Sequence, residues 1–442
     1  MSDTARRRGL AIVLAVVFLD LLGFGIIVPI LPYYTRSFPG GTEFVIGLLA
    51  ASYSAMQFVF APLLGSVSDR VGRRPVLVLS LVGSVVAWTL FGLADALWLL
   101  FAARMLAGAM GGNLSTAQAY VADVTPPEKR AAALGYIGAA FGLGFIFGPG
   151  IGAVLSFDAT IAAVDAVAPA AIPITRFSLP SFAAALFSLC GVVVALLFLP
   201  ESRTPDRDTG AGRVDRPSAI AQLRAAVTTA GLRELLTAFF LVSFAFSGVT
   251  VMFIPYVADV YGYTATQSAL LLTYIGLLAV LTQGVLIGRL TARYGPVPLA
   301  VAGAAALATA VGALPFSRSL GWVLPDLSGL VPLLTPDLLG LLAILTLLPV
   351  GNGILSVTLT ALVSQRASAD LQGSAFGVTQ GAGSLARAVG PPVMGGLYAA
   401  VGFWAPFVVG GLLLLPVVAL VARLGPTEQP PEARPADPGH AR

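Results

Sequence analysis

The sequence predicts an all-α membrane protein whose twelve transmembrane helices form two pseudo-symmetric bundles of six. Three features predict this fold: the composition, a series of long apolar stretches, and an internal repeat. Hydrophobic residues make up 57% of the 442 positions and charged residues 10%, and the mean hydropathy is +0.90. Soluble domains carry about 25% charged residues, so this chain is expected to lie in a lipid bilayer.

Twelve apolar stretches are long enough for a helix of about 20 residues to cross a bilayer. We expect these spans at residues 10–31, 45–67, 75–94, 97–121, 131–155, 179–199, 235–258, 267–289, 297–316, 338–363, 373–399 and 401–422.

The positive charges set the orientation. With both termini on the same side, 20 of the 25 Lys and Arg residues fall on that side, three fall outside (Arg36, Arg176, Arg318) and two fall inside spans (Arg104, Arg387). Because positive charge concentrates on the cytoplasmic side, both termini are expected in the cytoplasm of a plasma (inner) membrane protein.

The charged residues also divide the chain. We expect a six-helix bundle over 1–199, a cytoplasmic linker over 200–233, a second six-helix bundle over 234–423 and a disordered tail over 424–442. The linker is polar and Pro-rich and cannot form a core, although Ile220, Leu223, Val227 and Leu232 could form a short interfacial helix. Residues 156–178 and 318–337 are expected to be external surface loops.

Several function classes are not expected, because the residues that they require are scarce. Cys190 is the single cysteine and His440 the single histidine, so disulfide frameworks, thiolate metal sites and imidazole relays are not expected. The sequence has no recognisable nucleotide loop or nucleophile-base pair. We therefore expect no enzyme activity and no cofactor. The expected partners are the lipid bilayer, protons and a small-molecule substrate, with no nucleic acid, for a monomeric chain.

The turn from Gly65 to Pro75 places three arginines and Asp69 between two apolar spans. Glycine lets the helix ends approach, and the charges can pair or meet lipid phosphates. One alternative is that the arginines only fix orientation, but orientation requires neither glycine nor aspartate. Candidate residues of a cytoplasmic gate are Gly65, Asp69, Arg70, Gly72, Arg73, Arg74, Asp123, Glu128 and Arg130, the last three of which could equally form a solvated helix end.

An internal repeat relates the two halves. The pattern from Gly65 to Gly72 returns from Gly288 to Gly295, an offset of 223 residues, and the Gly148-Pro149 pair returns as Gly390-Pro391. Parallel repeats of this kind imply a substrate site between the halves near the bilayer midplane. The alternative is a chance likeness between glycine-rich helices.

The chain resembles the major facilitator superfamily, and within it the drug:proton antiporters of twelve spans. Residues 65–75 are similar to the signature loop after span two, and residues 100–112 to the motif of span four. Residues 144–152 are similar to the antiporter motif of span five, and residues 18–32 and 54–62 resemble the tetracycline and multidrug efflux subgroup. The resemblance implies proton-coupled export, with Asp69 locking the gate in the outward-facing state.

The chain departs from the tetracycline exporters at three positions. Where those proteins carry acids in spans three and nine and a histidine in span eight, this chain has Ala87, Leu307 and Ala279, although Gln283 is retained. The departures leave open whether tetracycline is a substrate.

Three ionisable residues lie inside predicted spans, where a charge costs at least about 2.5 kcal/mol. They are Asp20, Arg104 and Arg387, and we assign them to proton coupling, with Asp20 as the proton-binding group. A static Asp-Arg pair that only holds helices together is the alternative.

Two further sets complete the candidate site. The antiporter motif supplies Gly144, Gly148, Pro149 and Gly152, a smooth stripe that permits close packing and hinders proton leak. The polar residues expected to bind an amphiphilic, drug-like substrate are Tyr53, Gln57, Asn113, Gln118, Tyr274, Gln283, Asn352 and Gln380, each of which could instead hydrogen-bond a neighbouring helix.

The leading hypothesis is therefore a proton-coupled exporter of small organic molecules that works by alternating access. A metabolite importer or facilitator is the first alternative. A receptor or scaffold is a weaker alternative, because the halves are duplicated and each carries a gate motif.

Overall fold

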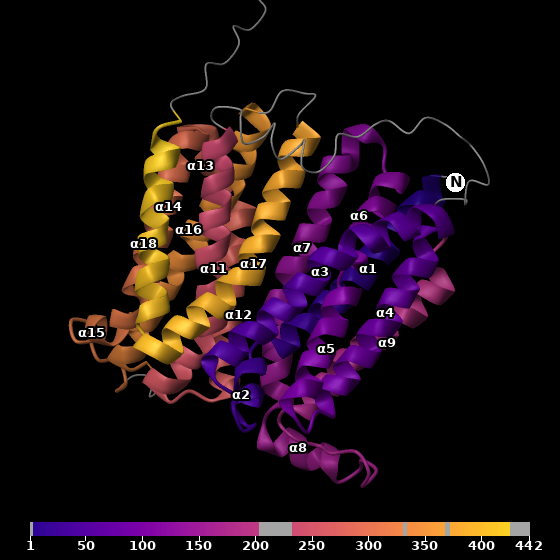
Figure 1. Cartoon of the computed structure of the whole chain (residues 1–442), viewed down its shortest axis with the longest axis horizontal. Helices are drawn as coiled ribbons and strands as arrows, with labels where there is room; N and C mark the ends of the chain where they lie inside the picture. The colour runs from indigo at the N-terminus through magenta and orange to yellow at the C-terminus, as the bar shows by residue number, and fades with distance from the viewer. Residues whose placement is uncertain (1–2, 203–231, 330–333, 367–371, 425–442) are drawn as a thin grey trace, which may run out of the picture.

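The computed structural model describes residues 3–202, 232–329, 334–366 and 372–424 (Figure 1). Within these ranges the regular structure is helical, and eleven helices are long and apolar enough to cross a membrane. Helix α17 (Gln372–Val401) occupies the remaining predicted span. The predicted all-α membrane fold is confirmed. Most of the predicted linker, with Ile220, Leu223 and Val227 of its interfacial helix, and nearly all of the predicted tail lie outside the described residues. The fourth residue of that predicted interfacial helix, Leu232, instead begins α11 and is buried.

The first half contains nine helices, of which α5 and α6 together make the fourth crossing. They are α1 (Asp3–Ile27), α2 (Leu31–Arg36), α3 (Glu43–Val71), α4 (Arg73–Gly92), α5 (Leu97–Met110), α6 (Asn113–Val124), α7 (Pro127–Leu155), α8 (Asp158–Asp165) and α9 (Ser178–Phe198). Helix α8 lies in the region predicted as an external loop.

The second half has the same plan with a break in its second crossing. Its elements are α11 (Leu232–Tyr261), α12 (Ala265–Leu281), η1 (Thr282–Leu286), α13 (Ile287–Tyr294), α14 (Pro296–Ala313), η2 (Leu314–Phe316), α15 (Ser317–Gly321), α16 (Pro336–Arg366), α17 and α18 (Ala405–Ala422). Element η1 is a π-helical turn, a local widening that is frequent at functional sites.

Backbone geometry supports the internal repeat. Gly72 joins α3 to α4 with φ of 104°, and Gly295 joins α13 to α14 with φ of 74°. Side chains rarely adopt these values, and the two glycines are 223 positions apart in the sequence. The two equivalent turns therefore share a positive φ angle, as expected if one half of the chain repeats the other.

Each half has its own apolar core. Tyr120 and Phe91 are fully buried in the first half, and Tyr256 and Phe407 are fully buried in the second. Large apolar side chains are also exposed on the outer surface, among them Trp98 at 68% exposure. Such exposure would be costly in water, but it matches a surface that faces lipid.

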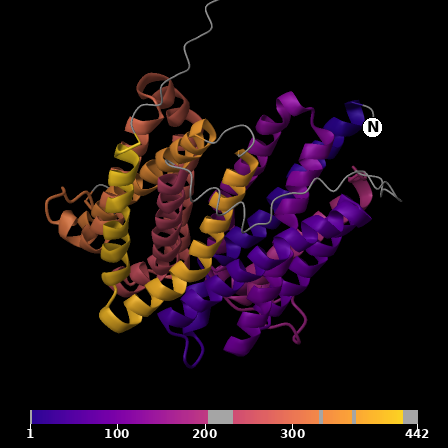
Figure 2. The same cartoon turned by 45° about the horizontal axis from the view of Figure 1, so that its top comes forward.

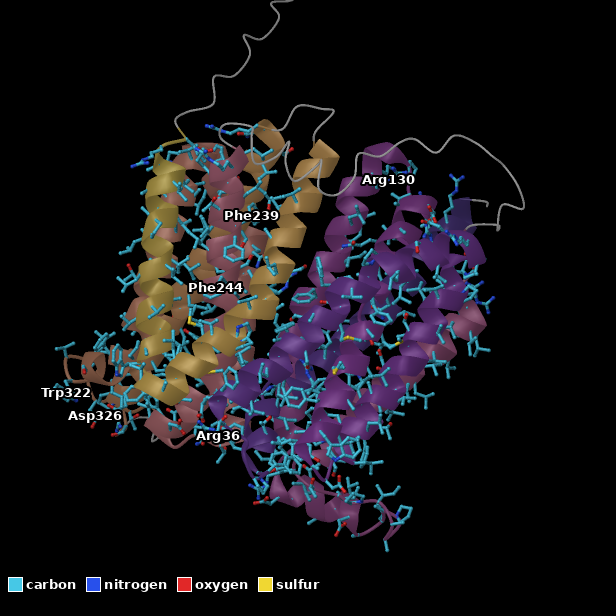
Figure 3. All side chains as sticks on the ribbon, viewed as in Figure 1. Arg36, Arg130, Phe239, Phe244, Trp322 and Asp326 are labelled. Carbon is cyan, nitrogen blue, oxygen red and sulfur yellow. The ribbon has the colours of Figure 1, made fainter. Side chains whose placement is uncertain are left out.

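The two halves meet at one end of the molecule and diverge at the other (Figures 1 and 2). The meeting end carries α2, and we call it the α2 face. The diverging end carries the Gly72 and Gly295 turns, and we call it the turn face. Arg36 lies where the halves join, and Arg130 lies at the turn face (Figure 3).

Glycine surroundings show the same asymmetry. Near the α2 face, a Cβ on Gly47 of α3 would lie 2.4 Å from the Pro391 carbonyl oxygen of α17. Toward the turn face, a Cβ on Gly135, Gly284 or Gly288 would meet no described atom within 4 Å. The structure is therefore open toward the turn face and closed at the α2 face.

Candidate functional site

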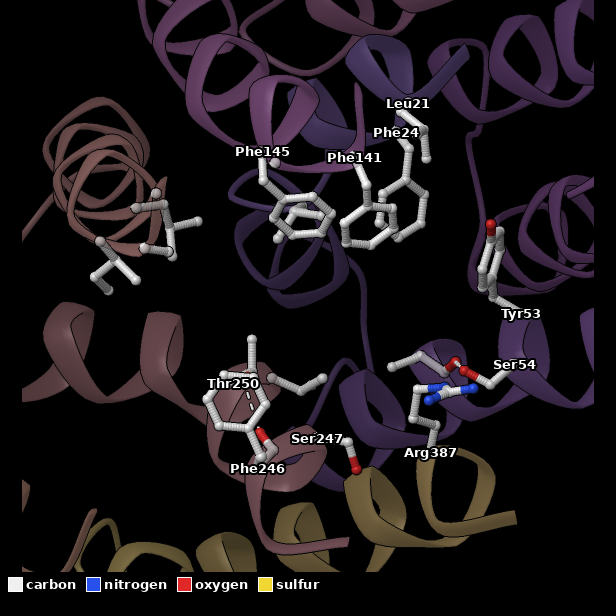
Figure 4. Close-up of a pocket in the computed structure, with 18 of the residues that line it drawn as sticks. Leu21, Phe24, Tyr53, Ser54, Phe141, Phe145, Phe246, Ser247, Thr250 and Arg387 are labelled. Carbon is white, nitrogen blue, oxygen red and sulfur yellow. Dashed lines mark hydrogen bonds between the residues drawn. The ribbon is translucent and has the colours of Figure 1, made fainter. Parts of the chain in front are cut away.

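A cavity of about 1180 Å³ lies between the halves. Helices α1 to α7 line it from the first half, and α11, α12, η1, α16 and α17 line it from the second. We call this space the central cavity (Figure 4). Its volume is sufficient for a drug-sized molecule.

One side of the central cavity is aromatic. The ring centroids of Phe141 and Phe145 are 4.8 Å apart, those of Phe24 and Phe145 are 5.8 Å apart, and those of Phe24 and Tyr53 are 5.1 Å apart. We call these four residues the aromatic wall. Phe246 of α11 lies across the cavity from it (Figure 4).

Asp20 lies in the cavity wall on α1 and is half-buried. Asn113, the first residue of α6, donates a hydrogen bond from Nδ2 to Asp20 Oδ2 at 3.0 Å. Asn113 reaches this position because Gly111 and Gly112 separate α5 from α6. Sequence analysis named both residues but assigned them to different roles, whereas the structure brings them together.

Arg104 projects from α5 and is 5% exposed. Its guanidinium carbon lies 4.5 Å from the ring centroid of Tyr53 and 5.7 Å from that of Phe24, distances suited to cation–π attraction. Within the described residues Arg104 forms no salt bridge, and its Nε has no hydrogen-bond partner. The static Asp20–Arg104 pair considered above is thus not formed in this structure.

Arg387 projects from α17 into the cavity and is exposed there. It points toward Ser54 of α3 (Figure 4). Its Nη2 donates to Ser384 Oγ, one turn earlier, at 3.0 Å.

The other predicted cavity residues divide into two groups. Gln57, Gln283 and Asn352 line the central cavity, and Gln57 Nε2 donates to the Gly111 carbonyl oxygen at 3.1 Å. Gln118 and Tyr274 do not lie among the described lining residues. Gln118 is five positions after Asn113 on α6, so it points away by about 140°, and the Tyr274 hydroxyl instead bonds Thr346 Oγ1 of α16 at 2.7 Å. The Gln380 side chain lies outside the described residues.

Comparison with known proteins identifies the family. The sequence model of the Major Facilitator Superfamily matches residues 13–391. The chain belongs to the major facilitator superfamily. It is 30% identical over 395 residues to the class C tetracycline resistance protein of Escherichia coli, covering 89% of this chain and 90% of that protein.

Two solved structures have the same fold. The crystal structure of the human organic anion transporter MFSD10 (TETRAN) superimposes with a TM-score of 0.63 at 26% identity, covering 94% of this chain and 99% of that one. A bacterial homologue of the human lysosomal transporter Spinster, crystallised inward-facing and unoccupied, gives a TM-score of 0.68 at 16% identity, covering 96% and 95%. The latter likeness shows the fold alone.

In this major facilitator chain, three of the predicted gate residues, Asp69, Arg73 and Asp123, form a charge network at the turn face. Arg73, 5% exposed, bonds Asp69 at 2.7 Å and Asp123 at 3.1 Å. Glu201 accepts hydrogen bonds from the backbone nitrogens of Arg73 at 2.8 Å and Arg74 at 3.1 Å. Sequence analysis did not predict the role of Glu201, because this residue lies 128 positions after Arg73, at the start of the expected linker.

The network stays within the first half. Asp123 also accepts from Ser202 Oγ at 3.1 Å, and a Cβ on Gly65 would meet only Ser115 of the same half, at 3.6 Å. Arg130 bonds the Ala122 carbonyl oxygen at 3.0 Å rather than an acid, and the Glu128 side chain lies outside the described residues. With the halves apart, these charges hold the end of one bundle together.

The antiporter motif residues pack α7 against α1. A Cβ on Gly25 would lie 2.4 Å from the Gly144 carbonyl oxygen, and one on Gly148 would lie 2.7 Å from Gly25 Cα. A Cβ on Gly152 would lie 3.0 Å from the Ile26 carbonyl oxygen. The backbones therefore touch along the stripe, and Pro149 lies inside the helix.

Sequence analysis missed a cluster that joins the halves at the α2 face. Arg36 of α2 bonds both carboxylate oxygens of Asp259 on α11, at 2.7 and 2.8 Å, and bonds Glu43 of α3 at 2.7 Å. Tyr398 of α17 donates to Asp259 at 2.6 Å. We call these four residues the latch. Burial lowers the pKa of Arg36, but hydrogen bonds to Asp259 and Glu43 raise it by more, so this guanidinium keeps its charge.

Proposed function

We propose that this chain exports small amphiphilic organic molecules across the plasma membrane in exchange for protons, by alternating access. The turn face would be cytoplasmic, since it carries most of the arginines. The chain would work as a monomer without a cofactor. The similarity to tetracycline resistance proteins supports export of drug-like molecules.

One observation carries the proposal. Asp20, a carboxylate in a membrane helix, lies in the wall of a cavity that is open toward the turn face and closed by the latch. A charge at this depth is costly, and the ionisable residues found in membrane helices usually serve a function. Asp20 can therefore exchange a proton with one side only in each conformation.

The cycle follows from that geometry. In the conformation described here, Asp20 would release its proton toward the cytoplasm and cargo would enter beside the aromatic wall. Opening of the latch and closing of the turn face would then expose both to the outside, where protonation of Asp20 releases the cargo. The glycine contacts between α1 and α7 would limit proton leak during rocking.

The experiment combines a screen with a vesicle assay. Expression of the chain in a pump-deficient host, challenged with tetracycline and a panel of amphiphilic drugs, would identify a cargo. Inverted vesicles with an imposed proton gradient should then accumulate it uphill. Asp20→Asn, which mimics the protonated carboxyl, should bind the cargo more weakly and lose uphill accumulation, and unchanged accumulation would refute the role of Asp20.

A second candidate is an importer or facilitator. The human relative named as an organic anion transporter shows that this fold carries other cargo than tetracycline. The same vesicles decide between the two, because a facilitator equilibrates cargo whatever the proton gradient.

A further inference from the structure

The central cavity contains more positive than negative charge. Its lining includes three ionisable side chains among the described residues, namely Asp20, Arg104 and Arg387. Two guanidinium groups thus face one carboxylate. In a space of low dielectric constant, such an excess attracts an anion.

Two of the three charges already have partners. Asn113 donates to Asp20, and Arg104 is buried against the rings of Tyr53 and Phe24. Arg104 therefore helps to hold α5 against the aromatic wall and presents little surface to a ligand.

Arg387 differs from Arg104 in both exposure and partners. It projects into the cavity, and its hydrogen bond within the described part of the chain goes to the neutral Ser384 Oγ. No carboxylate of the described residues forms a salt bridge with it. A guanidinium carries five N–H donors in a fork that fits an oxyanion, so Arg387 has donors left for a ligand in the cavity that it lines.

The surroundings of Arg387 suit an oxyanion attached to a ring system. Hydroxyl groups of Ser54, Ser243 and Ser247 line the same region, and Ser54 lies in front of the guanidinium (Figure 4). Phe24, Phe141 and Phe145 of the aromatic wall lie across the cavity from Arg387, and Tyr53 lies beside Ser54 (Figure 4). We infer that Arg387 binds an acidic group of the cargo, and that the cargo is an aromatic amphiphile carrying a carboxylate or a similar oxyanion.

The proposed exchange with protons, on which this step rests, defines the cargo further. A simple anion would bind more tightly when Asp20 is protonated, because protonation removes a repelling charge. Cargo and proton would then travel together, the opposite of exchange. Exchange requires that the cargo and the proton compete for Asp20. A cationic amine that pairs with the ionised carboxylate of Asp20 competes with the proton in this way. The favoured cargo class is therefore zwitterionic, with its acid at Arg387 and its amine at Asp20.

Binding to the purified full chain in nanodiscs tests this inference without any transport step. The probes are 3-(2-naphthyl)alanine, its carboxamide, which is only cationic, and its N-acetyl derivative, which is only anionic. The zwitterion should bind about tenfold more tightly than the carboxamide, the effect of one charged hydrogen-bonded contact. Arg387→Gln should abolish this difference, and Arg387→Lys should restore part of it.

The matched control is Arg289→Gln, which removes the same charge from an exposed position of α13 and should leave the preference intact. Equal affinity for the zwitterion and the carboxamide, an unchanged preference in Arg387→Gln, or binding of none of the probes would overturn the inference. None of these results would contradict the proposal that Asp20 couples transport to protons, which the vesicle assay tests. The two proposals can therefore be refuted independently.

Discussion

Arg36 and Asp259 connect the two halves through a bidentate salt bridge with N–O distances of 2.7 and 2.8 Å. The two residues are 223 positions apart, the same offset that separates Gly72 from Gly295. They are therefore at equivalent positions of the repeat. Equivalent positions of two halves related by a pseudo-two-fold axis can touch only near that axis, so the pair lies close to the axis that relates the halves.

Asp259→Asn should open the α2 face. The lost charge weakens a half-buried, two-pronged pair, and about 1 kcal/mol, or roughly a fivefold change in population, is expected. Spin labels at Asp95 and Ser319, exposed positions near the α2 face in opposite halves, should move apart in pulsed electron paramagnetic resonance. The labels are attached to cysteines introduced at these two positions in a chain that also carries Cys190→Ala.

Asp337→Asn is the matched control for that measurement. It breaks the Arg318–Asp337 salt bridge of 3.0 Å, which lies within the second half. The label distance should stay as in the unsubstituted chain. An equal shift in both variants would mean that the latch does not hold the halves together.

Raising the pH from 7 to 10 should not open the latch. Hydrogen bonds to Asp259 and Glu43 raise the pKa of Arg36 above its already high ordinary value, so its charge is complete throughout this pH range and is lost only at still higher pH. The same label pair, measured at both pH values, should give one distance distribution. Opening between pH 7 and 10 would show that another group controls the α2 face.

Gly148→Val should make the protein leaky to protons. Its Cβ would start 2.7 Å from Gly25 Cα, so α1 and α7 must separate. A pH-sensitive dye inside proteoliposomes should report faster acidification without cargo. Gly135→Val, on the same helix but with no described atom within 4 Å of its Cβ, should leave the leak unchanged. Equal leak in both variants would remove the sealing role from the stripe.

Arg73→Gln should destabilise the first half. Arg73 is buried and holds Asp69, Asp123 and the Ser68 hydroxyl, and the loss is expected to be about 1–2 kcal/mol, reduced because both acids are partly exposed. Thermal unfolding in nanodiscs should show a Tm lower by a few degrees. Arg70→Gln, at an exposed position of the same turn, should have little effect; a similar loss there would point to net charge rather than to the network.

The spans and the repeat were predictable because both are local properties of the chain. Apolar length determines whether a helix crosses the bilayer, and the Gly72 and Gly295 turns require the same backbone conformation. The antiporter glycines were also predictable, since a spacing of four residues places them on one face of α7. No knowledge of the partner helix was needed for that prediction.

The contacts between segments were not predictable from one sequence. Nothing local connects Asp20 with Asn113, and the misplacement of Gln118 shows that a polar residue in a span does not reveal which way it faces. The latch was missed for the same reason. Its members come from α2, α3, α11 and α17, and only the arrangement of the halves brings them together.

The exchange of cargo for protons through Asp20 is the central claim, and proton movement tests it most directly. Proteoliposomes loaded with a pH-sensitive dye would receive the cargo that the drug screen selects, with no imposed proton gradient. The account predicts that a cargo gradient drives protons in the opposite direction, and that Asp20→Asn carries cargo downhill without moving protons. Cargo-driven proton movement that persists unchanged in Asp20→Asn would contradict it.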